Sequence, residues 1–311
     1  MRTTWPVWKG LALRIEDSDA REDFLGSYAP LALVSFLLTW GVLLIIGYGL
    51  ILYGLRFSIH PAPNFGEAFY YAGVSFLTIG YGDFVATGGT SRFVSLLAGG
   101  NGFAVVAIVT AFLFSVFGAF ATRENFVITF GTRAGAPPSG VTLLETYALL
   151  GILEDVDDVF EDGLRWAAAV LESHLAYPIL AYFRSSHDNE SWIGALGALL
   201  DASTLKLTLL ADGPDGHAKL CNMMLRHTVR DLATYFRFET DPRPGIERQE
   251  FDVARDRLRE AGLRVRDADE AWVQFSDLRS NYATALNAMA TFFNIPPAQW
   301  IGDRSYLRPP H

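Results

Sequence analysis

Two long runs without a charged side chain constrain the fold more than any other feature of this sequence. Residues 29–55 and 93–122 contain no Asp, Glu, Lys or Arg. A bilayer hydrocarbon core of about 30 Å takes about 20 helical residues, so each run is long enough to cross a membrane. Half of the chain is hydrophobic and only 19% is charged, which is too apolar for an ordinary soluble protein. We therefore predict an all-α membrane protein with two transmembrane helices.

The second run is longer than a perpendicular crossing needs. As a straight helix its 30 residues would measure about 45 Å. The helix must tilt, bend or project beyond the lipid. Gly99, Gly100 and Gly102 mark the place where a bend is easiest, because residues without a Cβ loosen a helix.

The segment between the two runs is predicted to enter the membrane without crossing it. Pro61 and Pro63 end the first span, and Asn64 is placed to cap a short helix over 65–77. Such a helix is about 18 Å long, half a membrane deep. It is followed by Thr-Ile-Gly-Tyr-Gly-Asp at 78–83. Lipid tolerates glycine-rich backbone only where protein or a water-filled pore satisfies its polar groups, so we predict a re-entrant loop.

The order of span, short helix, Thr-Ile-Gly-Tyr-Gly-Asp and second span resembles the bacterial potassium channels with two transmembrane helices and one pore loop. The resemblance covers about residues 29–122. It implies that rings of backbone carbonyls replace the hydration shell of K⁺, which requires successive peptide groups to be turned the same way. Gly80 and Gly82 can supply the positive φ that this needs. The resemblance assigns the filter and its K⁺ ligands to Thr78, Ile79, Gly80, Tyr81 and Gly82, with the Thr78 hydroxyl at the inner end.

The same resemblance assigns roles around the filter. Its supporting residues would be Tyr70 and Tyr71, as aromatic braces behind Tyr81, together with Val74 and the mouth residue Asp83. Further along, it places a hinge at Gly102, and a cavity and inner gate at Thr110 and Phe114.

Two positions depart from the family pattern. Leu77 replaces a threonine behind the filter, and Val74 stands where some members carry a glutamate that bonds the mouth aspartate. Because that carboxyl pair is missing, we expect weaker slow inactivation.

The resemblance further implies a homotetramer in the lipid bilayer, since one chain supplies only a quarter of a closed filter. The permeant ion is K⁺, no organic cofactor is expected, and passive conduction needs no enzyme chemistry. A filter at the outer face implies a multi-pass protein of the cell (inner) membrane with both termini in the cytoplasm. The net charge of −9 disfavours nucleic acid as a partner.

The rest of the chain is predicted to be a second, soluble part. The expected domains are an N-terminal cytoplasmic segment (1–28), the pore domain (29–122), a linker (123–140) and an all-α cytoplasmic domain (141–311). Residues 123–311 hold 27 acids and 19 bases. Apolar residues recur at helical spacing over 143–153, 156–175, 192–210, 220–238, 251–261 and 271–293. We expect this domain to assemble or gate the pore, with a regulatory ligand or ion that the sequence does not identify.

Several weaker patterns leave alternatives open. The acids at 154–162 fail the spacing of a calcium loop and favour a solvated helix start. His217 and Cys221 are one turn apart, but two ligands favour a structural pair over a metal site. A dense polar and aromatic set indicates either a ligand pocket or, as we favour, a hinge; its members are His174, Tyr177, Pro178, Arg184, His187 and Trp192.

Two other functions compete with the potassium channel. A nonselective cation channel would carry an acidic or small residue in place of Tyr81, and this sequence does not. A membrane-anchored sensor would have its function in residues 141–311, where no nucleophile–base constellation or phosphate-binding loop is found in the sequence.

Overall fold

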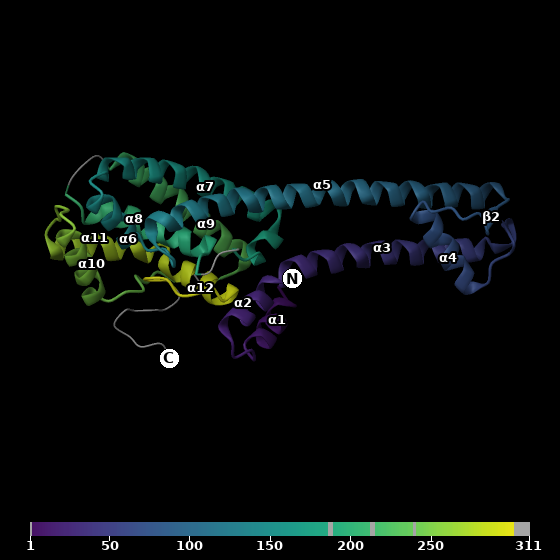
Figure 1. The fold of residues 1–311 in the computed structure, drawn as a ribbon, viewed down its shortest axis with the longest axis horizontal. Helices are drawn as coiled ribbons and strands as arrows, with labels where there is room; N and C mark the ends of the chain where they lie inside the picture. The colour runs from purple at the N-terminus through teal and green to yellow at the C-terminus, as the bar shows by residue number, and fades with distance from the viewer. Residues whose placement is uncertain (1, 186–188, 212–214, 239–240, 302–311) are drawn as a thin grey trace. The chain divides into compact units, whose positions relative to one another are not determined.

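The computed structural model describes residues 2–185, 189–211, 215–238 and 241–301 (Figure 1). Its regular structure is almost entirely helical, as predicted. The chain divides into two compact units, which are described separately. Unit 1 comprises Ser27–Phe117, and unit 2 comprises Arg2–Gly26 together with the described residues from Gly118 onward.

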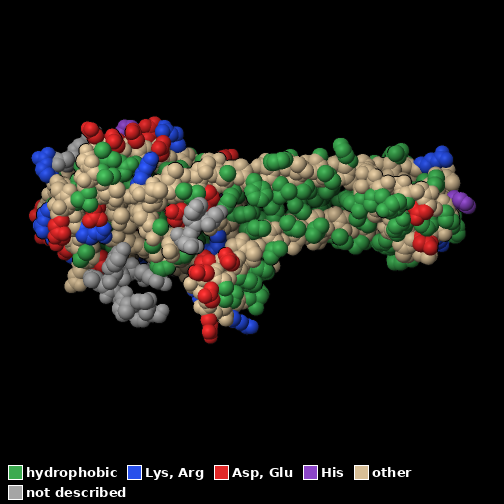
Figure 2. All heavy atoms as spheres, in the orientation of Figure 1, with side chains coloured by type: hydrophobic (Ala, Val, Ile, Leu, Met, Phe, Trp, Pro, Cys, Tyr) green, Lys and Arg blue, Asp and Glu red, His purple; other side chains and the backbone are tan. Residues whose placement is uncertain are grey.

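Unit 1 contains most of the two apolar runs that are predicted to cross the membrane. Its elements are α3 (Tyr28–Gly54), η1 (Arg56–Ser58), β1 (Ile59–His60), α4 (Phe65–Phe76), β2 (Val85–Ala86) and the first part of α5 (Gly89–Ala134). Two helical stretches are long and apolar enough to cross a membrane, Ser18–Gly54 and Gly89–Ala134. Only 11% and 6% of their most apolar windows are buried within the chain, and Figure 2 shows hydrophobic side chains covering much of the exposed surface of α3 and α5. The prediction of an all-α membrane protein is confirmed.

The core of unit 1 lies where α4 packs against α3. Leu52, Ile59, Tyr71 and Ala72 form a buried cluster, with four partly buried hydrophobic residues packed around it. Gly49 permits this packing, since a Cβ at that position would lie 2.8 Å from the Phe69 ring. The short helix α4 is therefore held against the first span by apolar contact.

Helix α5 runs without interruption from Gly89 to Ala134. The helix thus continues past Thr122, where the apolar run ends. The first residues of the predicted linker at 123–140 are therefore helical, up to Ala134, whereas the sequence predicted a linker between two domains. The reason is a buried stripe at helical spacing, Arg123, Val127, Phe130 and Ala134, whose side chains are at most 2% exposed.

Unit 2 is a bundle built around a buried central helix. The helices are α1 (Trp5–Ala12), α2 (Ser18–Gly26), the end of α5, α6 (Gly140–Leu149), η2 (Leu153–Asp155), α7 (Val156–Ala176), η3 (Pro178–Tyr182), α8 (Trp192–Thr208), α9 (Gly216–Phe236), α10 (Arg248–Glu260), α11 (Ala268–Ser280) and α12 (Ala283–Phe293). Nearly every residue of α8 is buried, and α8 packs against α6, α9, α11 and α12.

One predicted helix of unit 2 is two helices. The apolar spacing over 271–293 suggested a single element, but α11 ends at Ser280 and α12 begins at Ala283. Around this break Arg279 and Tyr282 both turn toward the buried Asp201 carboxylate, with Arg279 Nε and Tyr282 Oη 2.9 and 2.8 Å from the same Oδ1. The helix breaks where these buried polar side chains bond to one another. A pattern of apolar residues does not predict such a break.

Candidate functional site

The candidate site begins with a helix whose start is fixed by a reciprocal cap. The Asn64 side chain accepts a hydrogen bond from Glu67 N at 2.9 Å, and the Glu67 carboxylate accepts one from Asn64 N at 2.7 Å. This capping box satisfies two amides that would otherwise lack a partner. It confirms the predicted start of the short helix at Phe65.

The end of α4 passes directly into the glycine-rich loop. Leu77 N donates to Gly73 O at 2.8 Å, Thr78 N donates to Ser75 O at 3.1 Å, and Ile79 N donates to Val74 O at 2.9 Å. The first loop residues thus remain bound to the last turn of the helix. The direction of the loop is therefore set by α4.

The loop alternates between backbone conformations of opposite hand. Gly80 and Gly82 have φ of +65° and +81°, as predicted, and Thr78 adds a third positive φ of +56°. Sequence reasoning placed Thr78 in the filter but did not predict its positive φ, because a β-branched residue in the left-handed region is uncommon. Positive φ at every second residue is the pattern expected when successive peptide groups turn the same way. Such a strained threonine also points to a functional position.

The side chains of this loop lack cover within one chain. Tyr81 is 70% exposed and Ile79 is 48% exposed. Leu77, just before the loop, is 57% exposed. Several large apolar side chains exposed so close together are expected to contact other protein or lipid. These side chains are therefore available for contact with lipid or with other protein.

The return limb of the loop is pinned to the end of the first span. Strands β1 and β2 pair antiparallel, with Ile59 opposite Ala86. The carbonyl of Ser58 accepts hydrogen bonds from Thr87 N at 2.8 Å, Gly88 N at 3.2 Å and the Ser91 hydroxyl at 2.8 Å. The loop is thus anchored at both ends, by α4 before it and by this small hairpin after it.

The two tyrosines predicted to brace Tyr81 lie in different surroundings. Tyr71 is 8% exposed and belongs to the core of unit 1, where its hydroxyl lies 2.9 Å from Ser95 Oγ. Tyr70 is 43% exposed and its hydroxyl interacts with the Asp83 carboxylate. Tyr70 and Asp83 are therefore brought together, whereas Tyr71 braces α4 against α5.

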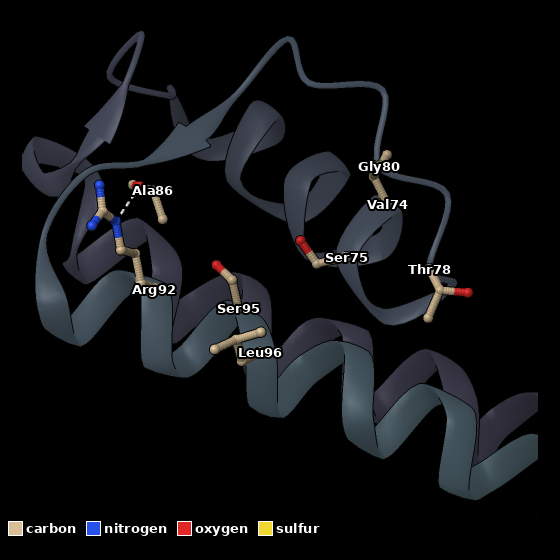
Figure 3. Close-up of a pocket in the computed structure, with 8 residues that line it drawn as sticks. All are labelled: Val74, Ser75, Thr78, Gly80, Ala86, Arg92, Ser95 and Leu96. Atoms are coloured by element: carbon tan, nitrogen blue, oxygen red, sulfur yellow. Dashed lines mark hydrogen bonds between the residues drawn. The ribbon is translucent and has the colours of Figure 1, made fainter.

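Val74 lies on one wall of a cavity beside the loop. The cavity has a volume of about 470 Å³ and is open to one side; its lining residues are Val74, Ser75, Thr78, Gly80, Ala86, Arg92, Ser95 and Leu96. Figure 3 shows Ser95 and Leu96 on α5 beneath Ser75 of α4, and Arg92 Nε donating to Ala86 O at 3.1 Å. Val74 supplies no carboxyl partner for Asp83, and the Tyr70 hydroxyl interacts with the Asp83 carboxylate.

Gly102 lies where α5 touches the end of α4. A Cβ on Gly102 would overlap Phe76 O, and one on Gly99 would lie 3.4 Å from Ser75 O. Glycine is needed here for close approach of two backbones. No interruption of α5 occurs at this position.

Further along α5, Thr110 and Phe114 are exposed within the chain, Phe114 by 75%. Their spacing of four residues places them on one face of the helix. That is the arrangement expected of side chains that line a common space.

The acids at 154–162, the pair of His217 and Cys221, and the set at 174–192 do not form a metal site among the described residues. No group of three His, Cys, Asp or Glu there could hold an ion. Cys221 is fully buried, and burial raises the pKa of its thiol to about 12, so it is an unreactive core residue. Of the set at 174–192, His187 lies outside the described residues, and His174 and Trp192 pack together with ring centroids 4.8 Å apart.

Comparison with known proteins identifies the part of the chain that carries the site. Residues 36–119 match the model of a family of ion channels. The chain is also 24% identical over 208 residues to the uncharacterized membrane protein YdjJ of Bacillus subtilis (strain 168), an alignment that covers 64% of this chain and 58% of YdjJ. The chain thus spans less than two thirds of that relative. No solved structure matches.

The matched segment runs from within α3 to the part of α5 that follows Phe114. It includes α4 and the glycine-rich loop. These residues carry an ion-channel domain in a membrane protein.

Proposed function

We propose that this protein is a potassium-selective channel in which four copies surround one pore. The observation that carries the proposal is the positive φ at Thr78, Gly80 and Gly82, directly after a helix that is only half a membrane long. Carbonyl oxygens of residues 78–81 would take the place of water around K⁺, with the Thr78 hydroxyl at the inner end and Asp83 at the outer mouth. The ion is the cargo, and its passage is passive.

The surroundings of the loop support a fourfold assembly. Each copy would supply one filter strand, and the uncovered side chains of Ile79 and Tyr81 would pack against neighbouring copies. The carboxyl ends of four α4 helices would point their partial negative charge at the ion path. Thr110 and Phe114 would line the cavity and the inner gate. Gly102 would act chiefly as a packing contact between α4 and α5.

The environment follows from the same proposal. The protein would lie in the cell membrane with its filter at the outer face and both termini in the cytoplasm. Unit 2 would then be the cytoplasmic part that gates the pore, in response to a ligand, an ion or a partner still to be identified. Barium, which has the radius of K⁺ but twice its charge, would block the pore.

Flux from liposomes tests the proposal. The purified full chain is expected to release K⁺ in preference to Na⁺, and barium is expected to stop the release. Gly80→Ala should reduce the flux at least tenfold, because alanine at positive φ costs about 1–2 kcal/mol in each of four copies. Gly100→Ala is the matched control, since a Cβ there meets nothing within 4 Å. A wild-type protein that assembles but releases no K⁺, or releases K⁺ and Na⁺ equally, would contradict the proposal.

A further inference from the structure

The first charged residue after the apolar run of α5 is a buried arginine. Arg123 is 2% exposed. Its Nη1 donates to Leu180 O at 2.8 Å, its Nη2 donates to Phe183 O at 2.9 Å, and its Nε donates to the Glu124 carboxylate at 2.8 Å. A buried guanidinium needs all of these acceptors. The end of the second span is thus bound to the backbone that follows α7.

The same backbone segment is also bound by the N-terminal hairpin, which consists of α1 and α2. The Trp5 ring meets the Tyr182 ring edge-on, with centroids 5.6 Å apart. Arg184 Nε donates to the Glu22 carboxylate at 2.9 Å, and its Nη1 and Nη2 donate to Phe293 O and Asn294 O at the end of α12. The hairpin directly precedes α3, the first span.

Helix α7 also contacts α5 beside Arg123: Trp166 Nε1 donates to Arg123 O at 3.2 Å, and the Trp166 ring stacks on Phe126 with centroids 4.6 Å apart. A cavity of about 240 Å³ lies there, lined by residues of α5 and α7 that include Ala119, Thr122 and Val170. The aromatic contact of Phe120 with Phe183, at 5.5 Å between ring centroids, lies on the same side as the Arg123 hydrogen bonds. The segment after α7 and α7 itself therefore both attach α5 where it leaves the apolar run.

We propose that residues 178–184 form a coupling segment that ties the cytoplasmic ends of both spans to one element. Arg123 attaches the second span, and Trp5 and Glu22 attach the hairpin that leads into the first. A displacement of one attachment would reach the other through seven residues of chain. The inference rests on the proposed channel function, for which it supplies a route from unit 2 to the pore.

Arg123→Gln in the full-length protein tests the coupling. We expect K⁺ flux from liposomes to differ at least fivefold from wild type, because glutamine cannot reach the two carbonyls with a planar fork. Arg165→Gln is the control: Arg165 is a 60% exposed arginine of α7, and its loss should leave flux within twofold. If Arg123→Gln does not fold, Arg123→Lys keeps the charge and still removes the fork.

A covalent bridge separates coupling from a structural defect. Phe120→Cys and Phe183→Cys are introduced together with Cys221→Ala, and the two new thiols are joined by a short bismaleimide. In the Arg123→Gln background the bridge should return flux to within twofold of the value with Arg123 present. A folded Arg123→Gln protein with wild-type flux, or a bridge that restores nothing, would overturn the inference.

Hydrogen exchange keeps the two proposals distinguishable. If the wild type conducts no K⁺, the proposed function fails, and the coupling is then judged by exchange alone. Arg123→Gln should raise amide exchange at least threefold both in Leu180 and Phe183 and in the N-terminal hairpin, which Arg123 does not contact. Faster exchange confined to the neighbours of residue 123 would contradict the coupling.

Discussion

At the scale of single residues, Gly102 shows how tightly the two parts of the candidate site approach each other. Its Cα lies so near the end of α4 that a Cβ would overlap Phe76 O. The family pattern suggested a hinge at this glycine, and sequence alone does not separate a hinge from a close contact. Both need a residue without a side chain, and only the neighbouring backbone tells them apart.

Gly102→Ala is expected to destabilise unit 1. The added Cβ must displace the end of α4, and overpacking of this kind costs about 1–3 kcal/mol. The thermal unfolding temperature of the detergent-solubilised protein should fall by several degrees, while Gly100→Ala leaves it unchanged. Equal stability of the two variants, with altered flux only in Gly102→Ala, would instead favour the hinge.

His174 is expected to make unit 2 sensitive to acid. Burial, followed by the neighbouring charge of Arg123, lowers the pKa of this histidine to about 3. The unfolded chain takes up a proton near pH 6.5 and the folded chain does not, so stability falls as the pH falls between these values. The loss is about 1.4 kcal/mol per pH unit from about pH 6 to pH 4.

Unfolding in denaturant at several pH values measures this effect. In His174→Gln the free energy of unfolding should lose about that much of its slope against pH. In His60→Gln, a change at an exposed position of unit 1, the slope should stay as in the wild type. Parallel slopes for wild type and His174→Gln would show that another group carries the acid sensitivity.

At the scale of elements, the sequence predicts helix starts better than helix continuations. Asn64 marks its helix because a cap is a local signal, and the two apolar runs mark theirs by length. The extension of α5 beyond Thr122 and the break between α11 and α12 depend on burial against distant residues. Arg123 bonds carbonyls 57 and 60 residues away, and Tyr282 bonds a carboxylate 81 residues away. No local pattern encodes those partners.

The capping box of α4 provides an element-scale prediction. Asn64→Ala and Glu67→Ala should each lower the stability of unit 1 by about 1 kcal/mol. The double variant should lose less than the sum of the two, because either change breaks the reciprocal pair. Unfolding curves of the four proteins form a complete double-mutant cycle, and simple additivity would contradict the reciprocal cap.

At the scale of the whole molecule, the N-terminal hairpin belongs to unit 2 although the whole of unit 1 separates it in sequence from the rest of that unit. The sequence predicted a cytoplasmic N-terminal segment and named no contact for it. Its attachment rests on Trp5 Nε1 donating to Phe292 O at 2.8 Å and on the ion pair of Glu22 with Arg184. The helical spacing of α1 gives no sign of these long-range contacts.

Glu22→Gln is expected to loosen the hairpin. Loss of a charge-assisted hydrogen bond to the largely buried Arg184 is worth about 1 kcal/mol, which corresponds to roughly fivefold faster cleavage after residues 13–21 in limited proteolysis. Asp19→Asn, an exposed change in the same helix, is the matched control. Equal cleavage rates for the two variants would mean that Trp5 and its neighbours hold the hairpin without the ion pair.

The uncovered side chains of the glycine-rich loop bear on how the proposed channel is made. One copy leaves Ile79 and Tyr81 exposed, so in the proposed assembly the loop is expected to reach its final form only after the spans have been inserted and other copies have arrived. Before that moment the copy would offer an unfinished surface to membrane quality-control proteases. Orphan subunits should therefore be short-lived, and the abundance of the protein should rise more steeply than its rate of synthesis.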